Sequence, residues 1–413
     1  MNLISKENLF ENAADFLKKL NAAANHSQIV DLWRSTNFPY KIKSTDPYKD
    51  TYREEVLYVY KQLTGMSYDV VNEWTSTLQA PEDFELGYPW MSRNFNVIAE
   101  EIGKPIQVLR ALHELNIEQL RLIEFGAGWG NLSIPLAKSG VDTTIVDIDR
   151  GFLDRAERIA AREGVKVQTI CGDFNEVAQG DHGRFNVAVF QSSFHHCLDF
   201  ERLIVALRTN MLDRDGMILF VNEPISDELQ FPWGLRYDGE SLWAIMCNKW
   251  LELGFHSDFF SEMLLKNGML PQTIPGIPSL VGQGWKATIG NRGVQFSELR
   301  LPSRFSATFH EWDGASGGRF CRATSSLPPV GGSGMNGYDI DFVNHSLLPL
   351  QFSTGQGSER RSLTLTSGER TTQRFSAQER PLDIHSSTFV PYDQNGSTDF
   401  RVLGVLIDRI ALY

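Results

Sequence analysis

The sequence predicts an α/β protein whose doubly wound, Rossmann-like core is preceded by a helical region and followed by an all-β sandwich. Three observations support this prediction: strands alternate with helices over about residues 120–224, helical periodicity fills the N-terminal region, and composition changes near Asn291. Strand–helix alternation of this kind builds a parallel sheet covered by helices. We therefore expect a helical region at 1–100, a core domain at 101–292 and a β-sandwich at 293–413.

The N-terminal region has apolar residues at helical spacing. Residues 7–23 repeat apolar side chains every three or four positions, and residues 52–63 and 92–102 follow the same pattern. This period places the apolar side chains of each segment on one face, so we expect amphipathic helices that pack against the rest of the chain. The aromatic cluster at 88–90 is interpreted as core packing or, alternatively, as the wall of a pocket.

A glycine-rich turn follows the first predicted strand of the core. The apolar run at 122–125 leads into Gly126, Gly128 and Gly130, which alternate with other residues before a helix begins near Leu132. Alternating glycines let the backbone adopt crowded conformations and approach a ligand closely. The free N–H groups at the start of the next helix suit polar or anionic ligand groups. The sequence therefore predicts a ligand site at this turn.

Acidic residues follow the next strands of the core. These strands are expected at 143–146, 165–170, 185–191 and 217–221, with closing strands at 271–274 and 285–289. The carboxyl ends of parallel strands share one edge of the sheet, where ligands bind. Asp147, at the tip of the second strand, can hold ribose hydroxyls there. Asp173, at the tip of the third strand, can accept a hydrogen bond from the amino group of a base.

The segment from about residue 120 to 224 resembles the class I S-adenosylmethionine-dependent methyltransferases. Residues 124–130 match their first motif, an acid followed by Gly-x-Gly-x-Gly, whereas nucleotide dehydrogenases favour Gly-x-Gly-x-x-Gly. Asp147 matches the ribose-binding acid of the family, and residues 172–174 match the adenine-contacting motif. The resemblance implies that S-adenosylmethionine is the cofactor and that the N-terminal helices form a lid. The cofactor-binding residues that it implies are Glu124, Gly126, Ala127, Gly128, Gly130, Asp147, Ile148, Asp173, Phe174 and Gln191.

A pair of histidines follows the fourth predicted strand. His195 and His196 stand at the carboxyl end of that strand, beside the expected cofactor site. Methyl transfer to an alcohol needs an aligned nucleophile and removal of its proton, and histidine titrates near neutral pH. We predict that His195 or His196 is the catalytic base. The alternative is that the pair packs and orients the loop while a carboxylate serves as the base.

The loop after the fifth predicted strand combines aromatic, basic and acidic side chains. Such a mixture can hold an acceptor by stacking and by bidentate hydrogen bonds. The residues predicted to bind the acceptor are Glu223, Trp233, Arg236 and Asp238. We assign no metal ligands, although carboxylates here would suit Mg²⁺ if several oxygens converged. Further along, Glu252, His256 and Asp258 fit the exposed face of a helix that ends near Asn267.

The C-terminal region has the pattern of an antiparallel sandwich or jelly roll. Short alternating runs separated by turn residues follow Asn291, for example at 338–343, 362–366 and 402–410. Residues 309–320 and 399–405 resemble a β-sandwich that is appended to bacterial glycosyltransferases and other surface-glycan enzymes. Such a domain would bind glycan, for instance through Trp312, or would brace the core or a dimer.

The composition excludes some classes of partner. The net charge is −12 and basic residues are not clustered, which argues against nucleic acid. Apolar runs are too short for a membrane span, and the N-terminus lacks a signal-peptide core. The cysteines are scattered without metal-ligand spacing, as in reduced cytoplasmic proteins. We expect a cytoplasmic protein that binds a sugar or glycan acceptor, and the oligomeric state is left open, with a homodimer as one candidate.

Together these features predict a methyltransferase that O-methylates a sugar or glycan intermediate, as in polysaccharide biosynthesis. Two alternatives remain open. One is a small-molecule methyltransferase of secondary metabolism with a structural sandwich, which a buried apolar acceptor pocket would favour. The other is a non-catalytic glycan-binding protein with a vestigial cofactor fold, which would fail to bind S-adenosylmethionine.

Overall fold

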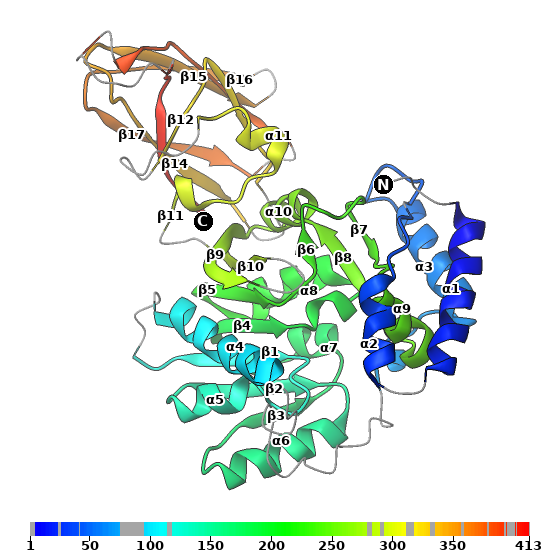
Figure 1. The fold of residues 1–413 in the computed structure, drawn as a ribbon. Coiled ribbons are helices and arrows are strands. Elements are labelled where there is room, and N and C mark those ends of the chain that lie inside the picture. The colour runs from blue at the N-terminus through cyan, green and yellow to red at the C-terminus, as the bar shows by residue number, and fades with distance from the viewer. Residues whose placement is uncertain are drawn as a thin grey trace.

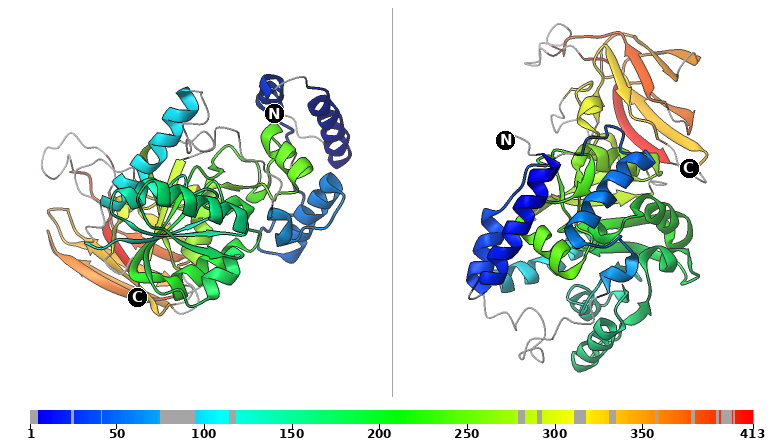
Figure 2. Two further views of the ribbon diagram at one scale, coloured as in Figure 1. Left: turned by 90° about the horizontal axis from the view of Figure 1, so that it is seen from below. Right: turned by 90° about the vertical axis from the view of Figure 1, so that its right-hand side faces the viewer.

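The chain forms three consecutive parts around one large sheet. The computed structural model describes residues 5–23, 26–40, 42–74, 95–113, 118–278, 283–289, 293–310, 318–330, 335–356, 359–377, 380–391, 394, 401 and 403–412. Blue N-terminal helices lie on one side of a cyan-to-green core, and a yellow-to-red β-rich part lies on another side (Figure 1). The two further views agree that these flanking parts occupy different sides of the core (Figure 2).

The helices before the sheet are amphipathic. They are α1 (Lys6–Ala22), α2 (His26–Ser35), α3 (Asp50–Thr64), the 3-10 helix η1 (Val70–Glu73) and α4 (Phe95–His113). In α1 the buried residues recur every three or four positions, as Leu9, Ala13, Phe16 and Leu20. The expected helices correspond to α1, α3 and α4, and α4 continues beyond the expected end to His113; residues 92–94 and the cluster at 88–90 lie outside the described residues. None of the described helices is long and apolar enough to cross a membrane.

The core is built on a seven-stranded sheet in the order β3-β2-β1-β4-β5-β10-β9. Its strands are β1 (Arg121–Phe125), β2 (Asp142–Asp147), β3 (Gln168–Cys171), β4 (Phe185–Gln191), β5 (Leu212–Val221), β9 (Leu270–Pro278) and β10 (Gln283–Thr288). Strands β1 to β5 are parallel, whereas β10 runs antiparallel to β5 and β9. The strand order reverses between β1 and β4, and ligands bind at such switch points, beyond the carboxyl ends of the strands.

Helices cover both faces of this sheet. The connecting helices are α5 (Ser133–Lys138), α6 (Arg150–Arg162), α7 (Phe174–Gln179), the 3-10 turn η4 (Phe194–His196), α8 (Phe200–Ala206) and the π-helical turn η5 (Leu207–Met211). Phe190 and Phe220 pack with α7 and α8 on one face, and Val189 and Leu219 pack with α4 and α5 on the other. Alternate strand residues point to opposite faces, which explains the continuous apolar runs in the sequence.

A smaller sheet, in the order β6-β8-β7, follows β5. This region contains β6 (Ile225–Ser226), β7 (Trp233–Leu235), α9 (Gly239–Trp243), the π-helical turn η6 (Ala244–Asn248), β8 (Leu253–His256) and α10 (Ser257–Lys266). The expected exposed helix face at Glu252 and His256 is wrong, because Glu252 directly precedes β8, His256 ends that strand, and α10 begins only at Ser257. Glu252 is buried at 7% exposure, on the side of the segment that faces His195.

The C-terminal part contains two antiparallel sheets. The first has the order β11-β19-β14-β17, with β12 also paired to β19, and the second has the order β13-β18-β15-β16. Its elements are β11 (Val294–Gln295), η7 (Phe296–Glu298), α11 (Ser303–Ser306), β12 (Arg319–Phe320), β13 (Thr324–Leu327), β14 (Gly337–Val343), β15 (Leu350–Gln356), β16 (Glu359–Leu365), β17 (Arg370–Ser376), β18 (Leu382–Ser386) and β19 (Leu406–Leu412). Phe342 and Phe352 join the two sheets, with ring centroids 4.8 Å apart. Trp312 and residues 399, 400 and 402 lie outside the described residues.

Candidate active site

The glycine turn after β1 depends on backbone conformations that favour glycine. Gly126, Gly128 and Gly130 have φ values of 70°, 53° and 73°, in the left-handed region where a Cβ is crowded. At Gly126 an added Cβ would lie 2.5 Å from the Cβ of Ser193, so the turn packs directly on the loop after β4. At Gly128 an added Cβ would meet no atom within 4 Å. The turn is therefore closed at Gly126 and open at Gly128, where a ligand can approach the backbone.

Buried acids end the first two strands beside this turn. Asp147 accepts hydrogen bonds from the N–H groups of Gly128 and Asp149, both at 2.9 Å. Burial raises the pKa of Asp147 to about 6, against the lowering effect of these two bonds. Burial likewise raises the pKa of Glu124 to about 7, although the Ser133 hydroxyl donates to it at 2.6 Å. Both carboxyl groups offer acceptors to hydroxyl or ammonium groups of a ligand.

A cavity of about 510 Å³ lies at this edge of the sheet. Ile148, Asp173 and Phe174 line it at the ends of β2 and β3. Asp173 also caps α7, because one of its oxygens accepts a hydrogen bond from the Asn175 N–H at 2.9 Å. The side-chain oxygen of Gln191, at the end of β4, is buried and accepts no hydrogen bond from the described residues. A polar ligand that binds at the open turn beside Gly128 could donate the hydrogen bond that the Gln191 oxygen lacks among the described residues.

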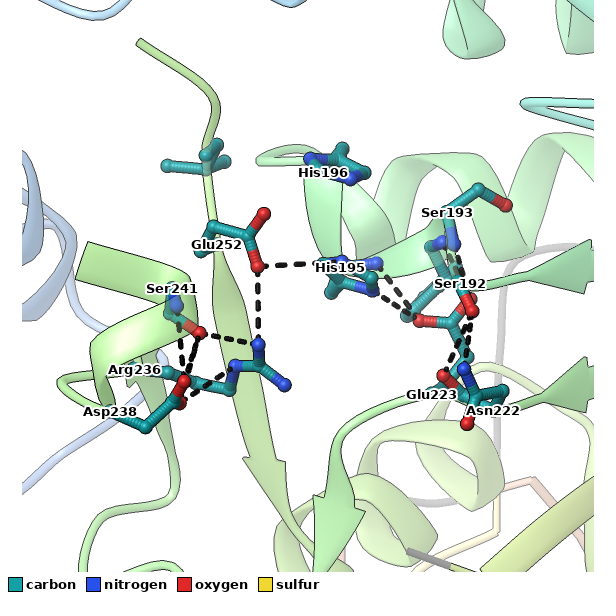
Figure 3. Close-up of polar contacts among 12 residues, drawn as sticks. Ser192, Ser193, His195, His196, Asn222, Glu223, Arg236, Asp238, Ser241 and Glu252 are labelled. Carbon is teal, nitrogen blue, oxygen red and sulfur yellow. Dashed lines mark hydrogen bonds and ion pairs between the residues drawn. The ribbon is translucent and has the colours of Figure 1, made fainter. Parts of the chain in front are cut away.

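His195 lies between two carboxylates at the end of β4. Its Nδ1 is 2.8 Å from Glu223 Oε2, and its Nε2 is 3.6 Å from Glu252 Oε2 (Figure 3). Because an ionised carboxylate only accepts hydrogen bonds, Nδ1 carries the hydrogen, and the neutral ring has its lone pair at Nε2. The His195 side chain is 8% exposed, so little water competes for that lone pair. The arrangement presents a proton acceptor to whatever enters between Nε2 and Glu252.

Glu223 orients both the ring and the loop that carries it. It is fully buried and accepts hydrogen bonds from the N–H groups of Ser193, Phe194 and His195, at 2.7, 2.9 and 3.2 Å. Burial alone would raise the pKa of Glu223, but its interaction with His195 and the hydrogen bonds from the N–H groups of Ser193 and Phe194 outweigh that effect, and the pKa is lowered. Glu223 is therefore a charged carboxylate whose position is set by several donors at once.

The ends of β4 and β5 are strained as well as polar. Ser192 and Asn222 have φ values of 53° and 55°, in the left-handed region that non-glycine residues rarely adopt. The Asn222 amide donates a hydrogen bond to the Ser192 hydroxyl at 2.6 Å, which links the two ends (Figure 3). Strain of about 1–3 kcal/mol per residue persists where the surroundings over-determine the backbone, and it is concentrated at functional sites.

A polar wall extends from His195 to the start of α9. Arg236 Nη2 lies 3.3 Å from Glu252 Oε2, and Arg236 Nε lies 3.5 Å from Asp238 Oδ2. The Ser241 hydroxyl accepts a hydrogen bond from Arg236 and donates to Asp238 at 2.9 Å (Figure 3). Carboxylates and a guanidinium thus alternate along the wall, and each can bind a hydroxyl group directly.

His196 interacts with the N-terminal part of the chain. Its Nδ1 lies 3.3 Å from Glu73 Oε2 in η1, and the other oxygen of Glu73 accepts the Leu251 N–H at 2.8 Å. Burial would lower the pKa of His196, but Glu73 and the nearby Glu252 raise it to about 9. Burial in turn raises the pKa of Glu73. A histidine that is already protonated at neutral pH cannot accept a further proton, so His195 is the stronger candidate for a base.

The remaining residues predicted to bind an acceptor have structural contacts of their own. Trp233 is buried, donates from Nε1 to the Pro47 carbonyl at 3.0 Å, and packs on Tyr52 with ring centroids 5.2 Å apart. Asp238 caps α9 by accepting the Ser241 N–H at 3.0 Å. Their contacts with an acceptor stay predictions.

Sequence reasoning missed Glu73, Ser241 and Glu252, which all take part in the polar contacts around the histidines. The signal for Glu252 was present, since Leu251, Leu253 and Phe255 alternate with polar or small residues at the period of a strand. Glu73 has no local signal, because its partner His196 is brought to it only by the packing of η1 against the core.

Comparisons with known proteins find matches to part of the chain. A family profile described as "Methyltransferase domain" matches residues 122–215. Ubiquinone biosynthesis O-methyltransferases from Coxiella burnetii strains Dugway 5J108-111 and RSA 331 are 28% identical over 122 residues, which is 27% of this chain and 52% of each relative. The chain therefore spans about half the length of these curated relatives.

Some solved structures are also similar to part of the chain. Magnesium protoporphyrin IX methyltransferase from Synechocystis PCC 6803, solved with bound SAH, is 16% identical and covers 46% of this chain and 82% of its own, with a TM-score of 0.35. The YcgJ protein from Bacillus subtilis is 17% identical and covers 41% of this chain and 69% of its own, with a TM-score of 0.33.

The local geometry fits the cofactor of this family. The turn is open at Gly128, Asp147 stands at the end of β2, and the Gln191 side-chain oxygen lacks a donor among the described residues. These features suit a ligand with ribose hydroxyls and an amino acid group. Residues 122–215 are an S-adenosylmethionine-dependent methyltransferase domain, and S-adenosylmethionine is its methyl donor.

Proposed function

We propose that the protein methylates a hydroxyl group of a sugar or glycan intermediate, with His195 as the base. The observation that carries the proposal is the His195 ring, with Nδ1 held by Glu223 at 2.8 Å and Nε2 left 3.6 Å from Glu252. A hydroxyl that enters beside Nε2 and Glu252 would donate its hydrogen to Nε2, while Glu252 keeps the hydrogen bond from Arg236. A hydroxyl oxygen loses its proton when it is methylated, so the reaction needs a proton acceptor, whereas a thioether sulfur has no proton to lose.

His195 and Glu223 have separate roles in the proposed reaction. S-adenosylmethionine, when bound, supplies a methyl group on a sulfonium sulfur. His195 Nε2 takes the proton of the attacking hydroxyl, and the charged Glu223 stabilises the imidazolium that results. Glu223 also fixes the ring, so the acceptor oxygen meets a base that is already oriented. General-base catalysis of this kind contributes about 10²–10⁴-fold to a rate.

The polar wall supports a polyhydroxylated acceptor. Glu252, Arg236 and Asp238 stand in a row beside His195, and each can bind a hydroxyl that neighbours the one being methylated. An acceptor with adjacent hydroxyls, such as a sugar, would use several of these groups at once. Cytoplasmic location and a homodimeric state stay predictions.

A variant of His195 tests whether its ring is the base. We expect His195→Asn to lower kcat by about 10²–10⁴-fold with little change in cofactor affinity. His182→Asn, an exposed histidine outside the site, is the matched control. Acceptors are screened by mass spectrometry of nucleotide sugars and cell glycans incubated with the protein and isotopically labelled cofactor. Near-normal turnover in His195→Asn, combined with loss in Glu223→Gln or Asp238→Asn, would assign the base to a carboxylate.

The cofactor site is tested separately by binding. Gly128→Leu would place a side chain in the open space of the turn, and Asp147→Ala would remove a carboxylate from the end of β2. We expect each variant to weaken S-adenosylmethionine binding at least tenfold in calorimetry. Undiminished binding in both would mean that the cofactor lies elsewhere.

A second acceptor class is a ring hydroxyl of a small aromatic molecule. The observation that favours it is the 28% identity to proteins named ubiquinone biosynthesis O-methyltransferase. The same labelled-cofactor assay separates the two classes when catechols and other phenols are included among the acceptors.

A further inference from the structure

We propose that His195, His196 and Glu252 form a site for one divalent transition-metal ion, zinc by preference, and that the bound ion inhibits methyl transfer. Each residue offers one ligand atom, and these atoms lie within 4.8 Å of one another. Imidazole and carboxylate groups are ordinary zinc ligands, and sites with fewer than four protein ligands leave a position for water. The predictions from the sequence assigned no metal ligand to any of these residues.

The spacing of the donors suits such an ion. His195 Nε2 and Glu252 Oε2 are 3.6 Å apart, and ligand atoms around a tetrahedral zinc ion with bonds of 2.0–2.1 Å lie about 3.3 Å apart. The widest separation in the group, 4.8 Å at most, would have to close by about 1.5 Å. In the neutral ring, Nε2 and the carboxylate oxygen are both acceptors that face each other, and a cation between them satisfies both.

Each ligand also has a partner that orients it. Glu223 lies 2.8 Å from His195 Nδ1, Glu73 lies 3.3 Å from His196 Nδ1, and Arg236 lies 3.3 Å from Glu252. Metal-binding histidines commonly have a carboxylate of this kind behind the ring. Arg236 opposes a cation, and His196, whose pKa is raised to about 9, must release its proton before its ring can bind a metal. Glu223, whose pKa is lowered, and Glu252 are the carboxylates that compensate the charge of the ion, and in surroundings with little water that compensation is strong.

The inhibitory effect follows from the lone pair that the ion would use. His195 Nε2 is the atom that accepts the proton in the proposed function, and it cannot do so while it is bound to a metal. This part of the inference rests on the proposed function, whereas the metal site itself does not. Zinc would therefore lower turnover without blocking the glycine turn or Asp147, which hold the cofactor.

Metal binding is measured first, on the full chain without cofactor or acceptor. Titration with Co²⁺, followed by its visible absorption, and calorimetry with Zn²⁺ are expected to show one ion per chain. His196→Asn and Glu252→Gln should each weaken binding at least tenfold, whereas His182→Asn should bind as the wild type does. The two ligand variants are independent, so one informative result remains if the other fails to fold. Absence of saturable binding, or equal binding by all variants, would overturn the site.

Inhibition is measured next, with an acceptor that supports turnover. We expect saturating Zn²⁺ to reduce the wild-type rate at least tenfold and a chelator to restore it, with unchanged affinity for S-adenosylmethionine. His196→Asn and Glu252→Gln should need at least tenfold more zinc for half-inhibition, each relative to its own zinc-free rate. Zinc that binds stoichiometrically but leaves turnover unchanged or raises it would contradict the inhibitory role. A protein that binds zinc at this site but methylates no acceptor would instead contradict the proposed function.

Discussion

The N-terminal helices and the C-terminal sandwich both flank the methyltransferase domain, but they are joined to it in different ways. Phe16 of α1 and Val59 of α3 belong to the same continuous hydrophobic cluster as Phe190 of the central sheet. The sandwich has a separate cluster, which among the described residues takes only Leu265 and Leu270 from the region before it. The N-terminal helices therefore share a hydrophobic core with the methyltransferase domain, whereas the sandwich has a hydrophobic core of its own.

The same contrast extends to the site. Glu73 of η1 pairs with His196, and Tyr52 of α3 donates a hydrogen bond to the Trp233 carbonyl at 2.6 Å. The carboxylates within ion-pair distance of His195 and His196 among the described residues are Glu73, Glu223 and Glu252, and all three precede the sandwich in the chain. The N-terminal helices are therefore part of the catalytic unit, whereas the sandwich is an attached domain.

Deletion of each flanking part gives the largest expected effect. A chain that ends at Arg292 should keep a folded core that binds S-adenosylmethionine, because domains with their own core fold alone. A chain that lacks residues 1–74 should lose the fold and the binding, because it removes one side of the shared cluster. Circular dichroism and calorimetry measure both. Aggregation of the first chain would show that the apolar surface at Leu265 and Leu270 makes the sandwich integral to the core.

Matched cavity mutations sharpen the comparison. Phe16 and Phe352 are 3% and 2% exposed, in α1 and in the sandwich, and truncation of either to Ala should cost about 3–5 kcal/mol. Added S-adenosylmethionine raises the unfolding temperature of the unit that binds it, and this shift identifies which thermal transition belongs to that unit. We expect Phe16→Ala to lower that transition and Phe352→Ala to leave it in place. Equal shifts in both variants would mean that the two cores unfold together.

The pH dependence of stability tests the contact between Glu73 and His196. The pKa of His196 is raised to about 9 in the folded chain, so its proton stabilises the fold below the ordinary histidine pKa of about 6.5. That contribution is lost as the pH rises, by at most about 1.4 kcal/mol per unit up to pH 9. Urea unfolding of the wild type and His196→Asn at pH 6 to 10 measures the difference. Parallel curves would show that His196 is neutral throughout.

A single hydrogen bond gives the smallest expected effect. Tyr52→Phe removes the bond to the Trp233 carbonyl and should lower the unfolding free energy by about 1 kcal/mol. Tyr58→Phe, on the same helix but 47% exposed, is the control and should change little. Urea denaturation resolves a difference of this size. Equal stability of the two variants would mean that this hydrogen bond adds no net stability to the packing of α3.

Much of the core fold, and the conformation of the glycine turn, could be predicted from the sequence. Strand β4 spans the predicted residues 185–191, and the glycines at 126, 128 and 130 adopt the left-handed conformations that their spacing indicated. These features depend on local chemistry, namely apolar runs that are buried on both faces and a turn that only glycine accommodates. The segment at 252–256 was misjudged because a short run can suit either a strand or the start of a helix.

The sequence by itself determined that a strand, a glycine turn and two histidines stand in order along the chain, because these signals lie within a few residues of one another. Only the tertiary structure decided which partners the histidines have. Glu73, Glu223 and Glu252 come from three separate segments, and their approach to residues 195 and 196 depends on packing that no local pattern encodes. The partners bear directly on the chemistry of the two rings, because Glu223 fixes Nδ1 of His195 at 2.8 Å and Glu73 raises the pKa of His196.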